Sequence, residues 1–403
     1  MSAPKLRFKE FDEDWSESKL KDCIDSIDSG WSPQCESYPA DENEWAVLKT
    51  TSVDWDGFKA NFNKKLPSNL EARFEIEVKP KDILVTRAGP TERVGVVAVV
   101  PHNVRSKLMI SDKLIRLKAD NDNNPEFLGI SLSSVKCQNQ LQSKTSGLAK
   151  SQTNISQKIL SDVSLITPSK LEQTKIASFL SAVDEKISQL TQKHELLSQY
   201  KQGMMQKLFS QQIRFKADDG SEFGEWDTNR IQDVFTNKSK NFNPQIEENL
   251  PCIELEHLSQ NTGKILGTIK SSEQQSTKNL FKKNCVLFGK LRPYLRKFAK
   301  PQFTGVCSSE IWVLTGIKIS NNYLFHYIQS EHFSELTNIQ SGSKMPRADW
   351  NVISEAEIEY PCLEEQTKIA NFLSSIDQKV EVVTQQIEQA KQWKKGLLQQ
   401  MFV

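Results

Sequence analysis

The sequence predicts an α+β protein in which two mixed α/β domains are separated by a long antiparallel two-helix coiled coil. Three observations predict this class: a heptad-patterned segment occurs twice, short β-rich and helix-like runs fill the remainder, and 403 residues exceed the usual size of one domain. The duplication implies pseudo-two-fold symmetry. We expect a first domain at 1–168, a central spacer helix at 169–212, a second domain at 213–361 and a distal spacer helix at 362–403.

The internal repeat is the clearest feature of the chain. The segment EQTKIASFLSAVD at Glu172–Asp184 returns as EQTKIANFLSSID at Glu365–Asp377, and the match continues without a gap to the end of each helix. Between the repeated segments the two copies have diverged almost beyond recognition. The helices are therefore expected to do the same thing twice, whereas the domains do two different things.

A fainter match opens each half of the chain. LRFK at Leu6–Lys9 is followed by Trp15, and IRFK at Ile213–Lys216 is followed by Trp226. The repeat unit is therefore an entry segment, a variable domain and a helix. Ser169 precedes Glu172 by three residues, the spacing of a capping box at the start of the first helix.

Apolar residues recur at alternating steps of four and three in both helices, which is the pattern of a coiled-coil seam. Each helix should be roughly 50 to 57 Å long. Because the ends of a compact domain tend to lie close together, the second helix should run back along the first. The alternative is a coiled coil that only dimerises the chain. The predicted helix-pair interface comprises Ile176, Leu180, Val183, Ile187, Leu190, Ile369, Leu373, Ile376, Val380 and Val383, and the same seam also carries Lys201 and Lys394.

The segments between the helices read as mixed α+β domains. Strand-like runs occur at Val94–Val100, Asn284–Leu291 and Ser309–Gly316, and a helix-like run occurs at Asn321–Phe333. The domains therefore have sheets and helices of their own.

Charge is distributed unevenly, although the net charge is only +1. The segment from Gln274 to Ser309 has no Asp or Glu and eight basic residues, which suits a polyanion. The first domain has a weaker counterpart between Lys79 and Lys118. The alternative for both is a solvated basic face without a partner. The basic residues of the acid-free segment are Lys278, Lys282, Lys283, Lys290, Arg292, Arg296, Lys297 and Lys300.

The sequence contains few signals of catalysis. Seven scattered cysteines form no C-x-x-C, and five histidines show no metal-ligand spacing. No Walker A loop, glycine-rich cofactor loop or N-P-P-[YF] motif occurs. With no apolar run of about 18 residues, the chain is expected to be cytoplasmic, with no membrane partner. We expect no catalytic residue, no metal ligand and no cofactor of its own.

Two unlike domains joined to matching helices, with TPSKLEQTKIASFL and YPCLEEQTKIANFL at the junctions, resemble the specificity subunit of type I restriction-modification systems. FGKLRPYLRKFAKPQF at Phe288–Phe303 and SGSKMPRADW at Ser341–Trp350 look like a target-recognition domain of that family. The first domain departs from this pattern because it lacks an LRPYL-like stretch.

The resemblance implies that each domain reads one half of an asymmetric, bipartite site in double-stranded DNA while the helix pair sets the unread gap. It further implies two modification subunits that methylate adenine with S-adenosylmethionine, and restriction subunits that use ATP and Mg. Arg292 and Arg296 are the best candidates for DNA contact in the second domain, and Arg292 is the candidate for reading a base. Lys278, Lys282 and Lys283 lie in a more polar, mobile stretch and are expected to supply phosphate attraction only. The predicted DNA-binding residues are Arg87, Arg93, Arg105, Lys107, Lys282, Lys283, Lys290, Arg292, Tyr294, Arg296, Lys297, Lys344 and Arg347.

Two other functions remain open at this point. A scaffold or clamp would use the helices to bind proteins and touch DNA without sequence preference, so a random-sequence competitor would displace it from any duplex. A stand-alone methyltransferase would bind S-adenosylmethionine as an isolated chain.

Overall fold

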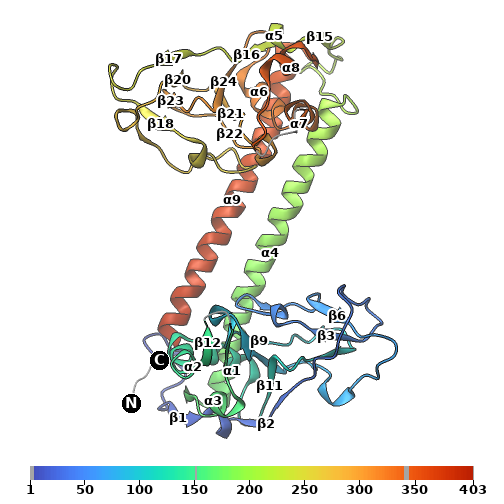
Figure 1. The fold of residues 1–403 in the computed structure, drawn as a ribbon, viewed down its shortest axis with the longest axis vertical. Coiled ribbons are helices and arrows are strands. Elements are labelled where there is room, and N and C mark those ends of the chain that lie inside the picture. Colours follow the sequence, from blue (N-terminus) through green and yellow to red (C-terminus); the bar gives the residue numbers. More distant parts are fainter. Residues whose placement is uncertain (1–3, 150–151, 340–344, 403) are drawn as a thin grey trace. The chain divides into compact units, whose positions relative to one another are not determined.

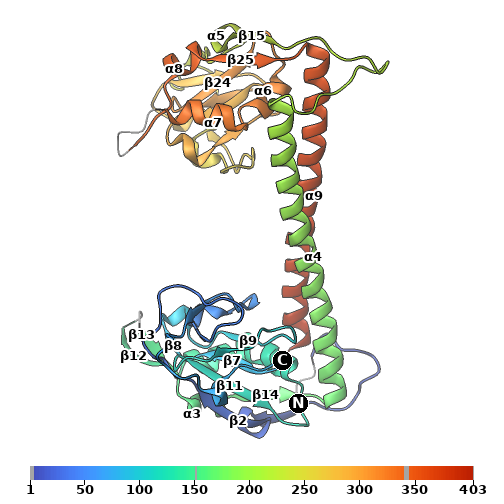
Figure 2. The same ribbon diagram turned by 90° about the vertical axis from the view of Figure 1, so that its right-hand side faces the viewer.

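The computed structural model describes residues 4–149, 152–339 and 345–402 (Figure 1, Figure 2). Two compact units form within it: unit 1 contains Met1–Leu190 and Gln386–Val403, and unit 2 contains Thr191–Gln385. Each unit has an α+β domain, as the sequence predicted. The units differ from the sequence-based division, because each long helix contributes one part to each unit.

The long helices are α4 (Lys170–Phe209) and α9 (Leu363–Met401), which have 40 and 39 residues. Both are drawn as continuous helices in Figure 1. Their sequences are rich in Leu, Gln, Lys and Glu, which favour helix, and neither contains proline. The capping box expected at Ser169 does not form, because the carboxylate of Glu172 accepts hydrogen bonds from Arg7 and Trp15 instead.

The domain of unit 1 is built on a four-stranded antiparallel sheet in the order β2-β11-β7-β9. Helix α1 begins at the side-chain cap of Asn124 and packs on this sheet. A smaller sheet, β10-β3-β6, covers a second apolar cluster. The elements are β1 (Ser16–Lys19), β2 (Ile24–Ser29), β3 (Ala46–Leu48), β4 (Val53–Asp54), β5 (Gly57–Phe58), β6 (Asn63–Lys65), β7 (Ile83–Thr86), β8 (Ala88–Gly89), β9 (Val97–Val99), β10 (Leu108–Met109), β11 (Leu114–Ala119), α1 (Pro125–Leu132), α2 (Val135–Gln142), β12 (Ser146–Ala149), β13 (Gln152–Asn154), α3 (Gln157–Ser161) and β14 (Ser164–Thr167).

The domain of unit 2 has the same plan. Its four-stranded sheet has the order β16-β24-β21-β22, and a five-stranded sheet has the order β17-β20-β23-β18-β19. Helix α6 packs on β24 and β21 of the first sheet. The elements are β15 (Asp227–Arg230), α5 (Ile231–Val234), β16 (Phe235–Thr236), β17 (Lys240–Phe242), β18 (Pro251–Ile253), β19 (Ile269–Lys270), β20 (Lys278–Phe281), β21 (Val286–Gly289), β22 (Phe298–Ala299), β23 (Gly305–Cys307), β24 (Ile311–Gly316), α6 (Asn321–Tyr327), α7 (Glu331–Asn338), α8 (Trp350–Glu355) and β25 (Glu357–Tyr360).

The helix-like run at Asn321–Phe333 folds as two short helices rather than one. The hydroxyl of Ser320 caps α6 by accepting from Tyr323 N, and the hydroxyl of Ser330 caps α7 by accepting from Phe333 N. A serine N-cap inside an apolar run starts a new helix because it satisfies amide groups that have no partner in the first turn. Figure 2 shows the two helices beside the sheet of this domain.

The entry segment of unit 1 joins the domain to its helix through a buried carboxylate. Arg7 donates from Nε and Nη2 to the two oxygens of Glu172, both at 2.7 Å, and Trp15 Nε1 donates to the same carboxylate at 3.3 Å. Glu172 is only 1% exposed. One residue further on, Gln173 donates to Pro168 O and accepts from Asn124 N.

The same contacts occur independently in unit 2. Arg214 donates to both oxygens of Glu365 at 3.2 and 2.7 Å, and Trp226 Nε1 donates to this carboxylate at 3.3 Å. Gln366 again bonds to the proline carbonyl, here of Pro361. The faint LRFK and IRFK match in the sequence thus reflects a junction that is built twice with the same chemistry.

Each unit also contains an ion pair between the long helices. In unit 1, Lys394 Nζ lies 2.5 Å from Asp184 Oδ1, and in unit 2, Lys201 Nζ lies 2.6 Å from Asp377 Oδ1. The predicted seam residues are mostly buried. Ile176, Leu180 and Val183 cluster with Leu397 and Met401 in unit 1, and Ile369, Leu373 and Ile376 cluster with Met205 and Leu208 in unit 2.

Candidate nucleic-acid interface

The loop between β21 and β22 in unit 2, Lys290–Lys297, carries five of the nine DNA-binding residues predicted for the second domain. Pro293–Leu295 form a 3-10 turn, and the residues on either side of it, Arg292 and Arg296, adopt left-handed backbone conformations with φ of 52° and 47°. For residues other than glycine this conformation costs about 1 kcal/mol or more each. Such strain persists only where the surrounding contacts hold the loop in place, and it is typical of functional sites.

A second segment pairs with this loop. Arg292 N donates to Pro346 O at 2.8 Å, Ala348 N donates to Lys290 O at 2.9 Å, and Leu291 and Arg347 form an isolated β-bridge. These bonds place Arg347 beside the β21–β22 loop, although it is 55 residues away from Arg292 in the chain. The side chain of Arg347 pairs with Glu310 at 3.0 Å and remains half exposed.

The loop and the segment paired with it therefore present exposed basic and aromatic side chains that can bind a polyanion. Arg292 and Arg347 are exposed, and Tyr294 is 53% exposed. An arginine next to an exposed aromatic ring suits both phosphate and base contacts. Lys290 lies at the start of the same loop.

Other predicted contacts of the second domain are separated from this group or hold the loop from within. Arg296 is half-buried, burial lowers its pKa, and its guanidinium donates to Gln329 O. Lys297 Nζ donates to Leu255 O at 2.6 Å. Lys282 and Lys283 are exposed but precede β21, so a strand of roughly 13 Å lies between them and the loop. Lys344 lies outside the described residues.

Lys278 does not fit the role expected of it. Rather than occupying a polar, mobile stretch, it is 4% exposed in β20, and its Nζ lies 2.6 Å from Glu254 Oε1. The acid-free appearance of the segment is misleading here, because the partner carboxylate comes from a distant part of the sequence. Lys278 is a structural ion-pair residue of the sheet.

The first domain contains a loop equivalent to β21–β22, which the sequence did not reveal. Arg87 follows β7 as Lys290 follows β21: Arg87 N donates to Lys113 O at 2.8 Å, and Ile155 N donates to Arg87 O at 3.0 Å. Pro90 then corresponds to Pro293. A 3-10 turn follows Pro90 directly, and the 3-10 turn of the second domain begins at Pro293. The backbone plan is retained while almost every side chain has changed.

Three predicted DNA contacts of the first domain have partners within the domain. Arg93 pairs with Asp54 at 2.7 Å and donates to Val53 O. Arg105 donates to the carbonyls of Glu42 and Glu44, and Lys107 Nζ donates to Asn43 O at 2.8 Å. Their charged groups contact loops that lie 39 to 64 residues earlier in the chain. Arg87 remains the candidate for DNA contact in the first domain, because it occupies the same position in its loop as Lys290 does in the second domain.

The Arg93–Asp54 contact predicts a pH dependence. Hydrogen bonds from Lys59 and Arg93 lower the pKa of Asp54 from 3.8 to about 2. A carboxylate whose pKa is lowered on folding stabilises the folded state above its unfolded pKa, and this contribution is lost as pH falls through the folded pKa. We expect Asp54→Asn to reduce stability by roughly 1 kcal/mol at pH 7 and to flatten its decline between about pH 4 and 2. Urea unfolding at several pH values measures both effects, with Asp56→Asn, at a more exposed partner of Lys59, as the control. Equal pH slopes for the wild type and Asp54→Asn would contradict this account.

Within the described ranges, no three or more His, Cys, Asp or Glu side chains are grouped so that they could hold a metal ion. All seven cysteines are free thiols, and burial raises the pKa of Cys252 to about 11. Across the same ranges, no helix is long and apolar enough to cross a membrane.

These features define a protein with two α+β domains of one plan and different loops, each attached to a long helix by the same Arg–Glu–Trp junction. The family described as the type I restriction modification DNA specificity domain matches residues 12–199 and 224–392, and the chain belongs to this family. The resemblance noted from the junction motifs is thereby confirmed.

Two curated relatives are specificity subunits. The chain is 40% identical over 166 residues to the type I restriction enzyme EcoEI specificity subunit of Escherichia coli. This match covers 41% of the chain and 28% of the relative. It is 25% identical over 268 residues to the MjaVIII specificity subunit of Methanocaldococcus jannaschii, covering 61% and 62%. The matches thus span less than two thirds of either relative.

Solved structures share the fold. The crystal structure of a type I restriction-modification S subunit from M. genitalium has a TM-score of 0.62 at 15% identity, covering 100% of this chain and 99% of that one. A chain from a study of complex assembly and conformational transition of the type I R-M system has a TM-score of 0.52 at 14% identity, with 98% of both chains covered.

Proposed function

We propose that this chain is the non-catalytic DNA-reading subunit of a type I restriction-modification complex, in which each domain reads one half of a bipartite, asymmetric site. The observation that carries the proposal is the pair of equivalent loops, Arg87–Val96 and Lys290–Lys297, on domains of one plan. The same backbone frame presents different side chains in the two domains. Such an arrangement suits recognition of two different half-sites, whereas a scaffold needs no such difference.

The helices are proposed to form one antiparallel pair that sets the unread gap and gives the chain its pseudo-two-fold symmetry. Two ion pairs support this. Asp184 and Asp377 are equivalent positions of the repeat, as are Lys201 and Lys394, and each acid pairs with the lysine of the other helix. In both helices the acid precedes the lysine in the sequence, yet each acid lies next to the lysine of the other helix. One antiparallel register of the two helices therefore accounts for both ion pairs.

The catalytic activities are proposed to belong to partners. Two modification subunits would bind the duplicated helices and methylate adenine with S-adenosylmethionine, and restriction subunits would use ATP and Mg. The repeated junctions and helix surfaces support two equivalent partners, since identical surfaces bind identical proteins. Such a complex would act in the cytoplasm, where the chain's thiols stay reduced.

A matched lengthening of both helices tests the proposal. Seven residues inserted after Leu190 in α4 and seven after Gln385 in α9 keep the heptad seam in phase and add roughly 10 Å to each helix. The gap should grow by about three base pairs, while both half-sites stay the same. Mapping of methylated adenines in cells that express the variant with the modification subunit measures the gap.

The single insertion in α4 is the control. It shifts the two halves of the seam out of register, so we expect methylation to fall without a new, defined gap. If the matched variant kept the old gap and changed the half-site bases, the helix pair would not set the spacing.

A further inference from the structure

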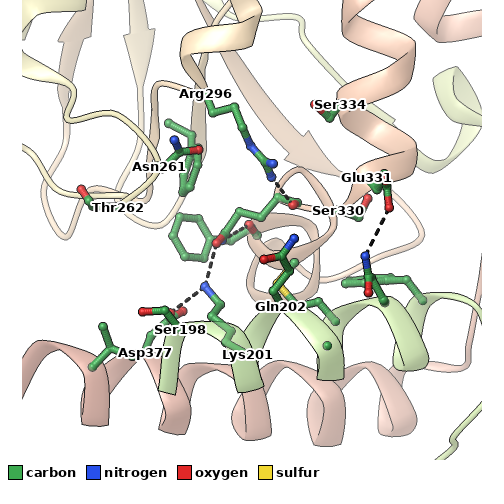
Figure 3. Close-up of a pocket in the computed structure, with 18 of the residues that line it drawn as sticks. Ser198, Lys201, Gln202, Asn261, Thr262, Arg296, Ser330, Glu331, Ser334 and Asp377 are labelled. Atoms are coloured by element: carbon green, nitrogen blue, oxygen red, sulfur yellow. Dashed lines mark hydrogen bonds and ion pairs between the residues drawn. The ribbon is translucent and has the colours of Figure 1, made fainter. Parts of the chain in front are cut away.

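Unit 2 contains an open cleft of 1520 Å³ between its domain and its parts of the long helices (Figure 3). Its walls come from α4, α9, α7 and the loop at 261–265, and Arg296 and Phe298 reach it from the end of the β21–β22 loop. The cleft has residues of the predicted DNA-contact loop and of both long helices in its lining. Contacts across it can therefore couple the two.

A chain of polar contacts crosses the cleft. The Arg296 guanidinium donates to Gln329 O, and Gln329 Oε1 accepts from Lys201 Nζ at 2.8 Å. The same Lys201 ammonium lies 2.6 Å from Asp377 Oδ1. Figure 3 shows Lys201 beside Asp377, with Arg296 on the other side of the cleft. The loop is thereby connected to α4 and α9 through one glutamine.

The groups of this contact chain are partly shielded from water, with Asp377 37% exposed. Lys201 is 17% exposed, and Gln329 is fixed further by donating from Nε2 to Phe325 O at 2.7 Å. His326 is fully buried beneath them, with Nε2 3.0 Å from Ser374 Oγ and Nδ1 3.9 Å from Asp377 Oδ2. Burial lowers the pKa of His326 to about 3, so this ring is neutral and Lys201 is the cation that meets Asp377.

Unit 1 keeps the helix ion pair but differs at the positions equivalent to Arg296 and Gln329. Arg93, which corresponds to Arg296, is bonded to Asp54 and Val53 O. Counted from the helix caps, Ser133 corresponds to Gln329, and its hydroxyl bonds to Gly129 O within its own helix. Lys394 keeps its ion pair with Asp184. The helix ion pair is therefore common to both units, whereas the described residues of unit 1 do not repeat the link to the loop.

We infer that Lys201, Gln329 and Arg296 are positioning residues that hold the β21–β22 loop in its strained shape against the helices, and so sharpen DNA reading by the second domain. The inference rests on the proposed function. The physical reason is preorganisation: a loop with two left-handed residues other than glycine relaxes when a tether is lost, and a relaxed loop discriminates less between correct and incorrect bases.

The test compares Lys201→Met with Lys394→Met in the full chain with the modification subunit present. Both variants remove an equivalent ion pair, but only the first also cuts the bond to Gln329. Affinity is measured for duplexes that carry the sequence selected by the wild type from a random library, and for single mismatches in each half-site. We expect Lys201→Met to lower discrimination in the second half-site by roughly three- to tenfold and to leave the first unchanged.

Two further variants separate positioning from general stability. Gln329→Leu should have the same effect as Lys201→Met, the double variant should be no worse than either, and Lys201→Arg should restore discrimination. Equal losses for Lys201→Met and Lys394→Met, or losses in both half-sites, would overturn the inference. A wild type that selects no sequence would instead overturn the proposed function, so the two failures can be distinguished.

Discussion

Replacement of Arg214 by Met is expected to lower the free energy of unfolding of unit 2 by about 3 kcal/mol. Arg214 is the cation that pairs with Glu365, and Glu365 is 0% exposed. Without the Arg214 guanidinium, the buried carboxylate keeps the hydrogen bond from the indole N–H of Trp226 but has no counter-charge. The loss of a partner from a buried ion pair costs more than the pair contributes net, because an unpaired buried charge remains. Urea unfolding measures the change.

Variants at the same junction provide the controls. Arg7→Met should destabilise unit 1 by a similar amount, since Glu172 is 1% exposed and has the same partners. In the double variant Arg214→Met/Glu365→Gln the buried charge is gone, so a good part of the stability should return. If the double variant were less stable than Arg214→Met, desolvated charge would not be the cause.

Replacement of Arg292 by Ala is expected to weaken binding to the cognate duplex by about 1 to 3 kcal/mol and to relax specificity at one position of the second half-site. The exposed side chain extends from a loop whose backbone is fixed by Pro293 and by the bond from Arg292 N to Pro346 O. A fixed backbone allows one side chain to meet one base edge. Salt titrations on cognate and single-mismatch duplexes, with the modification subunit present, measure both effects.

Lys282→Ala is the matched control, because Lys282 is exposed and basic but lies at the other end of β21. It should weaken binding to every duplex alike and reduce the salt dependence by about one phosphate contact. Equal losses on all duplexes for Arg292→Ala would make it a phosphate contact. A change confined to the first half-site would refute the assignment of the second domain.

The long helices and much of the sheet framework could be predicted because their signals are local and periodic. The heptad seam placed α4 and α9 to within a few residues of their ends, and the apolar runs at Asn284–Leu291 and Ser309–Gly316 contain β21 and β24. The division into units could not be predicted, because it depends on which halves of the helices pack against which domain.

The partners of the charged residues of the first domain could not be predicted for a different reason. A basic side chain looks available in a sequence until its partners are known, and the partners of Arg93 and Arg105 lie 39 and 61 residues away. The equivalent loop at Arg87 could not be predicted, because the two loops share their backbone hydrogen bonds but few of their side chains. Backbone hydrogen bonds leave no mark in the sequence. By contrast, the lysines at two seam positions were a usable signal: a charge in an apolar seam requires an acid opposite, and Asp184 and Asp377 stand at matching positions of the repeat.

The Arg–Glu–Trp junction has a consequence for how such a chain changes over generations. The residues that attach each domain to its helix lie at the two borders of the domain sequence, in the entry segment and in the EQT segment. A recombination event that exchanges everything between these borders retains both halves of the attachment and imports a ready-made domain. New specificity can therefore be acquired in a single genetic step, without the gradual repair of a disrupted interface.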